Sequence, residues 1–111
     1  MTRTPAIFKT DVSRALYEKL FTAVRRIGPH DVELKKTCVH ACRGRAFLGV
    51  HPRATGVLLS IVTDAPIKSE RLRKCEQLSA RRWHAQLLVE SPKELDAELK
   101  RWIAEAYALC E

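Results

Sequence analysis

Residues 45–62 read RAFLGVHPRATGVLLSIV, and this stretch decides the fold. Its last six residues, 57–62, are nearly all apolar, and three of them are β-branched. Such a composition is typical of a strand in the middle of a sheet. Residues 46–51 form the preceding strand, which Pro52 closes. The turn over residues 53–56 is short, so these two strands are expected to pair antiparallel.

Further strands are predicted on both sides of this hairpin. Residues 32–36 alternate apolar and polar side chains, and residues 38–42 form a short strand or continue the first one through a bend. Residues 43–45 read Arg-Gly-Arg, which is typical of a tight turn because glycine adopts a positive φ without strain. Residues 82–90 place alternate apolar side chains on one face. The predicted sheet has four or five antiparallel strands, and residues 64–80 show no clear pattern.

Two amphipathic helices are predicted, one before and one after the strands. The first begins at Thr10 or Asp11 and ends at Gly28, and its apolar side chains recur every three or four residues. The second begins at Ser91, which forms an S-x-x-E capping box with Glu94. Each helix must bury its apolar stripe against the sheet. We therefore expect an α+β fold with an N-terminal and a C-terminal helix packed on one sheet face, and with the other face partly open.

The length of 111 residues fits one domain, which we place at residues 10–111 after a loose leader at 1–9. No apolar run approaches the roughly 20 residues that cross a bilayer, and the first residues lack the apolar core of a secretory signal. We therefore expect a cytoplasmic protein that makes no membrane contact. In that compartment the four cysteines are expected to be free thiols; they are Cys38, Cys42, Cys75 and Cys110.

Basic residues are unevenly distributed along the chain. Residues 1–84 hold 17 Lys or Arg and 7 Asp or Glu, a net charge of +10, whereas residues 85–111 hold 3 and 6, a net charge of −3. A one-sided basic surface favours polyanions such as nucleic acid, although charge of this kind also serves solubility alone. The stretch from 34 to 63 has no acidic residue, and its candidate phosphate contacts are Lys36, Arg43 and Arg45.

The sequence lacks the motifs of several common kinds of active site. The four glycines form no nucleotide-binding loop, and the strands carry no paired carboxylates. The sequence Cys38-x-His40-x-Cys42 resembles a metal site at first. However, side chains on one face of a strand repeat every ~6.8 Å, too far apart for three ligands of one zinc ion. We therefore predict neither a metal nor a cofactor.

The candidate ligand-binding residues lie in two polar segments. His51 and Arg53 end one strand, and Ser79, Arg82 and His84 lead into the last. Arg binds phosphate through a two-pronged guanidinium, and His donates or transfers a proton. If both segments reached one end of the sheet, they would form an anion pocket, and the two histidines would be placed for phosphodiester chemistry. The structural alternative is that His51 caps a turn and that Arg82 pairs with an acid.

Four segments carry a family resemblance. They are FxxVRRIGP at 21–29, RAFLGVHPR at 45–53, EQLSARRWH at 76–84 and SPKELDAELKRWIAEAY at 91–107. With these motifs the chain resembles, over most of its length, the bacterial family called domain of unknown function 5655. The resemblance implies a compact domain that occurs alone or at the C-terminal end of larger bacterial proteins.

The resemblance also implies a polar motif just before and inside the last strand, together with residues of the 45–53 segment. In this chain the motif residues are Ser79, Arg82, His84, Phe47, His51 and Arg53. The chain departs from the family pattern in two places. Ala80-Arg81 stands where the family often has Lys-Asn, and Cys38 and Cys42 lie in a stretch that is often aromatic.

The function expected from these observations is a non-catalytic binding module for an anionic partner, either nucleic acid or a phosphorylated ligand. One alternative is a small hydrolase or phosphodiesterase that uses His51 and His84. Another is an interaction domain that forms homodimers through an exposed sheet face. The sequence leaves open whether the protein is a monomer or a homodimer.

Overall fold

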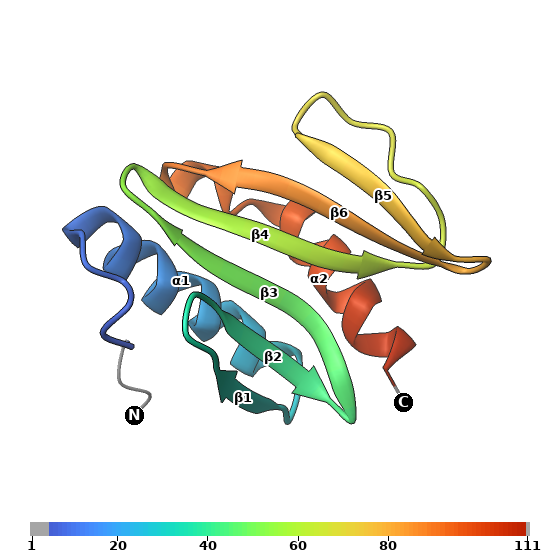
Figure 1. Ribbon diagram of the computed structural model, residues 1–111, viewed down its shortest axis with the longest axis horizontal. Helices are drawn as coiled ribbons and strands as arrows, with labels where there is room; N and C mark the ends of the chain where they lie inside the picture. The colour runs from blue at the N-terminus through green and yellow to red at the C-terminus, as the bar shows by residue number, and fades with distance from the viewer. Residues whose placement is uncertain (1–4, 111) are drawn as a thin grey trace.

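The computed structural model describes residues 5–110 and places two α-helices on one face of an antiparallel sheet (Figure 1). The elements follow one another as α1 (Asp11–Ile27), β1 (Asp31–Leu34), β2 (Val39–Arg43), β3 (Arg45–Arg53), β4 (Gly56–Thr63), β5 (Lys74–Ser79), β6 (Arg82–Val89), a 3-10 turn η1 (Pro92–Glu94) and α2 (Ala97–Leu109). The α+β class, the antiparallel pairing and the helices on one face are as predicted.

The sheet has six strands in the order β1-β2-β3-β4-β6-β5, rather than the predicted four or five. Residues 39–43 form the separate strand β2, which was one of the two predicted alternatives, because the chain turns back after β1, where Lys35 N–H donates to the Cys38 carbonyl at 2.8 Å. The strand beyond the predicted five is β5, within the stretch that showed no pattern. Five of the six β5 residues are exposed. The strand therefore lacks the alternation of apolar and polar residues by which a strand is predicted from sequence.

The two helices differ in how well their starts were predicted. Thr10 caps α1, since its side-chain oxygen accepts from Ser13 N–H at 3.1 Å. The predicted start of the second helix is wrong, because Ser91 caps only the 3-10 turn. Asp96 caps α2 instead and accepts from Leu99 N–H at 3.0 Å. The Glu94 carboxylate accepts from Glu90 N–H at 3.2 Å, so no reciprocal capping box forms.

The core lies between the helices and the sheet. Its fully buried side chains include Leu20 of α1, Leu59 of β4 and Ile103 of α2. Phe8 is also fully buried, with its ring centroid 4.6 Å from that of Tyr17. Within the predicted leader, Phe8 is therefore part of the core, whereas residues 1–4 lie outside the described residues.

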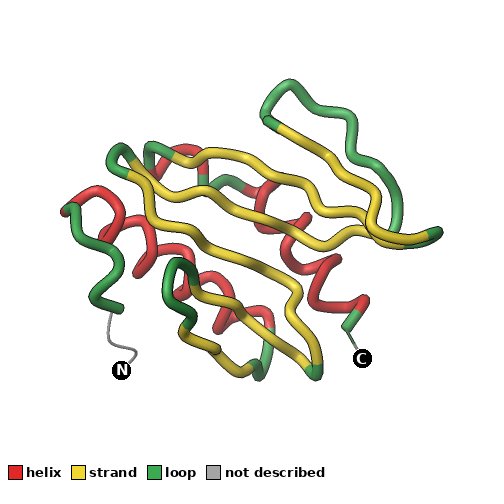
Figure 2. The backbone as a smooth tube through the Cα atoms, in the orientation of Figure 1, coloured by secondary structure: helices red, strands yellow, loops and turns green. Residues whose placement is uncertain are grey.

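The opposite face of the sheet is not covered by a helix of the described residues. In Figure 1 both helices lie behind the strands, and Figure 2 shows the same layering by secondary structure. No helix within residues 5–110 is long and apolar enough to cross a lipid bilayer. We call this uncovered side of the sheet the open face.

Candidate binding site on the open face

Strand alternation determines which side chains reach the open face. Leu59 and Ile61 of β4 are fully buried on the helix side, so Ser60 between them points to the open face. Ser60 lies opposite Gly49 of β3 on one side and opposite Gln86 of β6 on the other. Gly49 in turn lies opposite His40 of β2. These four residues form one row across four neighbouring strands.

A hollow of about 230 Å³ lies over this row. Its polar lining comes from four strands and consists of His40, His51, Ser60, His84 and Gln86. Gly49 forms the floor because it has no side chain. A Cβ atom placed there would lie 3.5 Å from Ser60 Cβ, 3.7 Å from His40 Cδ2 and 3.7 Å from His51 Nε2. These three side chains therefore surround the space above Gly49.

The predicted residues of the two polar segments share the open face but not one end of it. His51 pairs with Leu58 and His84 pairs with Val62, so four residues of β4, about 13 Å, separate their positions along the strands. The two segments therefore do not meet at one end of the sheet, although His51 and His84 both line the hollow. Since β3 and β6 both run antiparallel to β4, the end of β3 lies level with the end of β6, and not with its beginning.

His40 is the site residue that the sequence reasoning missed, because it was considered only as a metal ligand. It lies on β2, next to β3, at a level along the strands between those of His51 and His84. Burial is the main cause of the lowered pKa of His51 and of His84, and the charge of His40 contributes to both. His40 Nε2 is 3.5 Å from Cys38 Sγ. No group of three metal-binding side chains gathers among residues 5–110. The alternation of Val39, His40 and Ala41 was the available signal, since two apolar neighbours facing the core direct His40 outward.

The polar side chains of the hollow have almost no hydrogen-bond partners in the protein. His51, Ser60, His84 and Gln86 are half-buried, yet their side chains make no hydrogen bond to another described residue. Half-buried polar groups that lack a protein partner are satisfied by water or by a ligand. Serine and glutamine both donate and accept, and each imidazole has one group of each kind.

An arginine lies close to each of the two predicted histidines. Burial lowers the pKa of His51, and the charge of Arg53 lowers it further. Burial also lowers the pKa of His84, where Glu76 opposes the shift and Arg82 adds to it. Both rings are therefore mostly neutral near pH 7, with an arginine beyond each of them.

Two acids of the open face are paired with neighbouring lysines. Glu33 lies 3.3 Å from Lys35, and Glu76 lies 2.9 Å from Lys74. By contrast, Arg53 donates only to the Pro52 carbonyl at 3.0 Å, and Arg82 forms no ion pair with any described residue. The expected partners of the structural alternative, an acid for Arg82 and a turn for His51, are thus not found within residues 5–110.

The remaining predicted contacts lie outside the hollow. Ser79 is exposed and pairs with Arg82 beside the turn between β5 and β6. Lys36 is exposed in the turn after β1, and Arg45 is exposed at the start of β3. Arg43 has a structural role, because it donates to the Tyr107 carbonyl at 3.3 Å and lies 4.4 Å from the centre of the Tyr107 ring.

Phe47, which the family resemblance placed among the motif residues, is fully buried in the core. Its ring packs edge-on against that of Tyr107, with a centroid distance of 5.4 Å. Phe47 therefore supports the sheet from the helix side and does not reach the open face.

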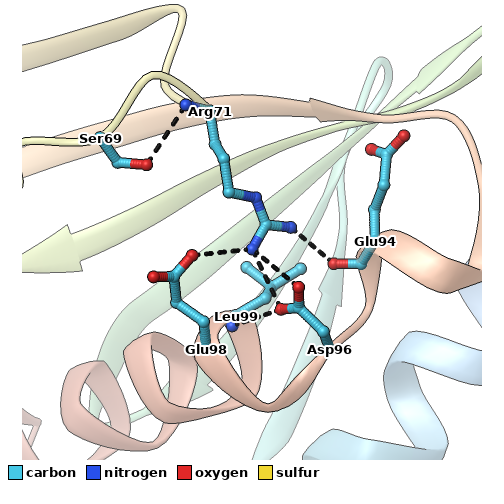
Figure 3. A network of polar contacts seen from close by, with 6 residues as sticks. All are labelled: Ser69, Arg71, Glu94, Asp96, Glu98 and Leu99. Carbon is cyan, nitrogen blue, oxygen red and sulfur yellow. Dashed lines mark hydrogen bonds and ion pairs between the residues drawn. The ribbon is translucent and has the colours of Figure 1, made fainter.

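A second polar cluster surrounds Arg71 at the start of α2 (Figure 3). The Arg71 guanidinium donates to Asp96 Oδ1 and Glu98 Oε1, both at 3.0 Å, and to the Glu94 carbonyl at 2.7 Å. It also lies 5.7 Å from the centre of the Trp102 ring. We call this group the Arg71 clamp. It attaches the connection between β4 and β5 to the second helix.

Comparisons with known proteins identify the chain by family alone. Neither the curated proteins nor the solved structures include a match to it. A family described as a domain of unknown function (DUF5655) matches residues 5–109, from the segment that contains Phe8 to the end of α2. This span includes both helices, all six strands and every residue of the hollow. The chain therefore belongs to the DUF5655 family.

Proposed function

We propose that the protein is a non-catalytic binding module that holds an anionic partner, nucleic acid or a phosphorylated ligand, on its open face. The observation that carries this proposal is the set of half-buried polar side chains in the hollow that have no partner among the described residues, His51, Ser60, His84 and Gln86. A face built only for solubility would have exposed charges rather than a half-buried polar hollow.

The charge arrangement supports an anion rather than a cation as the partner. Glu33 and Glu76 on the open face are each paired with a lysine, whereas Arg53 and Arg82 have no acidic partner among the described residues. Arginine binds phosphate oxygens with paired hydrogen bonds. An anion laid along the face would meet one arginine at each end.

An enzymatic role for His51 and His84 as a cooperating acid and base has less support. Such a pair acts on one reacting group, which each ring must reach directly or through one water. The positions of these two residues are about 13 Å apart along the strands, and β4 separates their strands β3 and β6.

The homodimer alternative also has less support on this face. The most exposed large apolar side chains lie on the helices and on the two edge strands, and none lines the hollow; they are Val12, Val32, Leu34, Leu78 and Leu109.

The proposal is tested by fluorescence anisotropy with labelled single-stranded and duplex oligonucleotides at low and near-physiological salt. The test variant is the double substitution Arg53→Ala, Arg82→Ala. The matched control, Lys19→Ala with Arg26→Ala, removes the same charge from exposed positions of α1. We expect binding that weakens with salt, and a slope of log affinity against log salt that is shallower by about 1.5 in the test variant than in the control.

Equal effects of the two double variants would show that net charge, and not the open face, attracts the anion, and would overturn the proposal. If no labelled oligonucleotide binds at low salt, nucleic acid is excluded as the partner. Inorganic phosphate and polyphosphate, added as competitors or followed by NMR shifts of the histidine rings, then decide whether any anion binds the face.

A further inference from the structure

Resting on the proposed function, we infer that the ligand is single-stranded nucleic acid, with one unstacked base seated over Gly49 between His40 and His51 and the phosphates extending towards Arg53 and Arg82. The inference follows from the size of the hollow, the length of the face and the contrast between its neutral centre and charged ends.

The hollow is too small for a whole small-molecule ligand. Pockets that enclose such ligands measure roughly 300–1,000 Å³, whereas this hollow measures about 230 Å³. It therefore accommodates one group of a larger molecule, most of which lies outside it.

The polar face is also long. His51 and His84 are four residues apart along β4, and Arg53 and Arg82 lie two residues further out at either end, which gives eight residues in all. At ~3.3 Å per residue the backbone positions of the two arginines are about 26 Å apart in this direction. A single phosphorylated metabolite does not span this distance, but an extended strand of several nucleotides does.

The centre of the face is suited to a base and not to a phosphate. His40 and His51 flank the open space above Gly49, and rings of this kind stack on unpaired bases. Ser60 and Gln86 lie in the same row with free donors and acceptors for the edge of a base. The cations stand outside this centre, where the phosphates of a strand passing through it would lie.

A duplex does not match this arrangement. Its bases are paired inside the helix, so it presents phosphates and groove edges to a protein. The polar centre of the face would then contact no base, and only the arginines would contribute to binding. A single strand uses both parts of the face, because its bases are free to turn towards the protein.

The decisive variant is Gly49→Ala. The added methyl group fills the floor of the hollow, while its nearest contacts, at 3.5 and 3.7 Å, are ordinary van der Waals distances. The strand has no positive φ at this position, so the fold is expected to tolerate alanine. A thermal unfolding curve like that of the wild type confirms this tolerance. The independent variant His40→Ala, at a position outside the core cluster, removes one stacking ring.

The probes are labelled DNA and RNA strands of about 12 nucleotides, the same strands with abasic central positions, and a duplex, with inorganic polyphosphate as a competitor. We expect the abasic strands to bind about tenfold more weakly than the intact ones. Gly49→Ala and His40→Ala should each weaken binding of the intact strands about fivefold to tenfold and leave polyphosphate competition unchanged within about twofold.

The possible outcomes separate the inference from the function on which it rests. If intact, abasic and duplex probes bind alike, and Gly49→Ala has no effect, the inference is wrong while anion binding stands. If Gly49→Ala unfolds the protein, the abasic probe and His40→Ala decide the question. If neither the oligonucleotides nor polyphosphate bind at low salt, the inference and the proposed function both fail.

Discussion

The Arg71 clamp and the hollow on the open face are both polar clusters, but they differ in how their hydrogen-bonding groups are used. In the clamp, one guanidinium meets two carboxylates and a carbonyl of the same chain. In the hollow, four half-buried side chains from three strands, β3, β4 and β6, have no such partners among the described residues. A cluster whose hydrogen-bonding groups are paired within the protein holds segments together. Groups without a protein partner are available to water or to a ligand. Arginines are present in the clamp and also beside the hollow, so the proposed site is supported by this difference in partners and not by charge alone.

Replacing Arg71 should give the largest effect on stability. The Arg71→Ala variant loses the ion pairs with Asp96 and Glu98 and the contact with Trp102. Because the two carboxylates are about half-exposed, we expect a loss of about 2 kcal/mol in the free energy of unfolding. Arg71→Lys should recover only part of it, since an ammonium cannot form the same fork. Urea denaturation measures both variants.

The matched control for the clamp is Ser60→Ala in the hollow, for which we expect a change within about 0.5 kcal/mol. If this control destabilises the protein as much as Arg71→Ala does, the hollow has a structural role and the contrast between the two clusters fails.

The two clusters should also respond to acid in different pH ranges. Burial and Arg53 lower the pKa of His51 in the folded state, so the unfolded chain binds more protons. The contribution of His51 to stability is complete above about pH 6.5 and is lost as the pH falls from there towards the folded pKa. His84 contributes with the same sign. Urea midpoints between about pH 8 and 5 should fall with acid, and less so in His51→Gln.

In the clamp, the Leu99 N–H and Arg71 lower the pKa of Asp96 below its ordinary value of 3.8. The stability that depends on Asp96 is therefore present above that value and is lost only as the pH falls below it.

An unchanged slope of stability against pH near pH 6 in His51→Gln would argue against the neutral histidine inferred for the hollow. Addition of an anion that binds the open face should raise the pKa of His51, which NMR titration of the ring detects.

The smallest effect is expected at Tyr17, whose hydroxyl is enclosed in the core without a partner among the described residues. Burial raises the pKa of this phenol. Tyr17→Phe removes a polar atom that gains no hydrogen bond, so we expect a gain of about 0.5 kcal/mol in the free energy of unfolding. A loss of more than about 1 kcal/mol would show that the hydroxyl has a bonded water, and that lack of a protein partner does not by itself indicate a ligand site.

The elements with a local signal were predictable from the sequence alone. The first helix has a capping threonine and a regular apolar stripe, and residues 57–62 are apolar enough to be central in any sheet. The family motifs were also recognisable without coordinates. In each case the physical cause lies within a few residues of the chain: a cap, a periodic face or a turn.

The arrangement of the site was decided only by the tertiary structure. The polar strand β5 exists because β6 offers it a pairing edge, and Phe8 is buried because the core has room for its ring. His40, His51 and His84 gather on one face, but at separate levels, because strand order and register join residues that are distant in sequence. Alternation predicts the face of each side chain, whereas its neighbours across the sheet depend on long-range pairing.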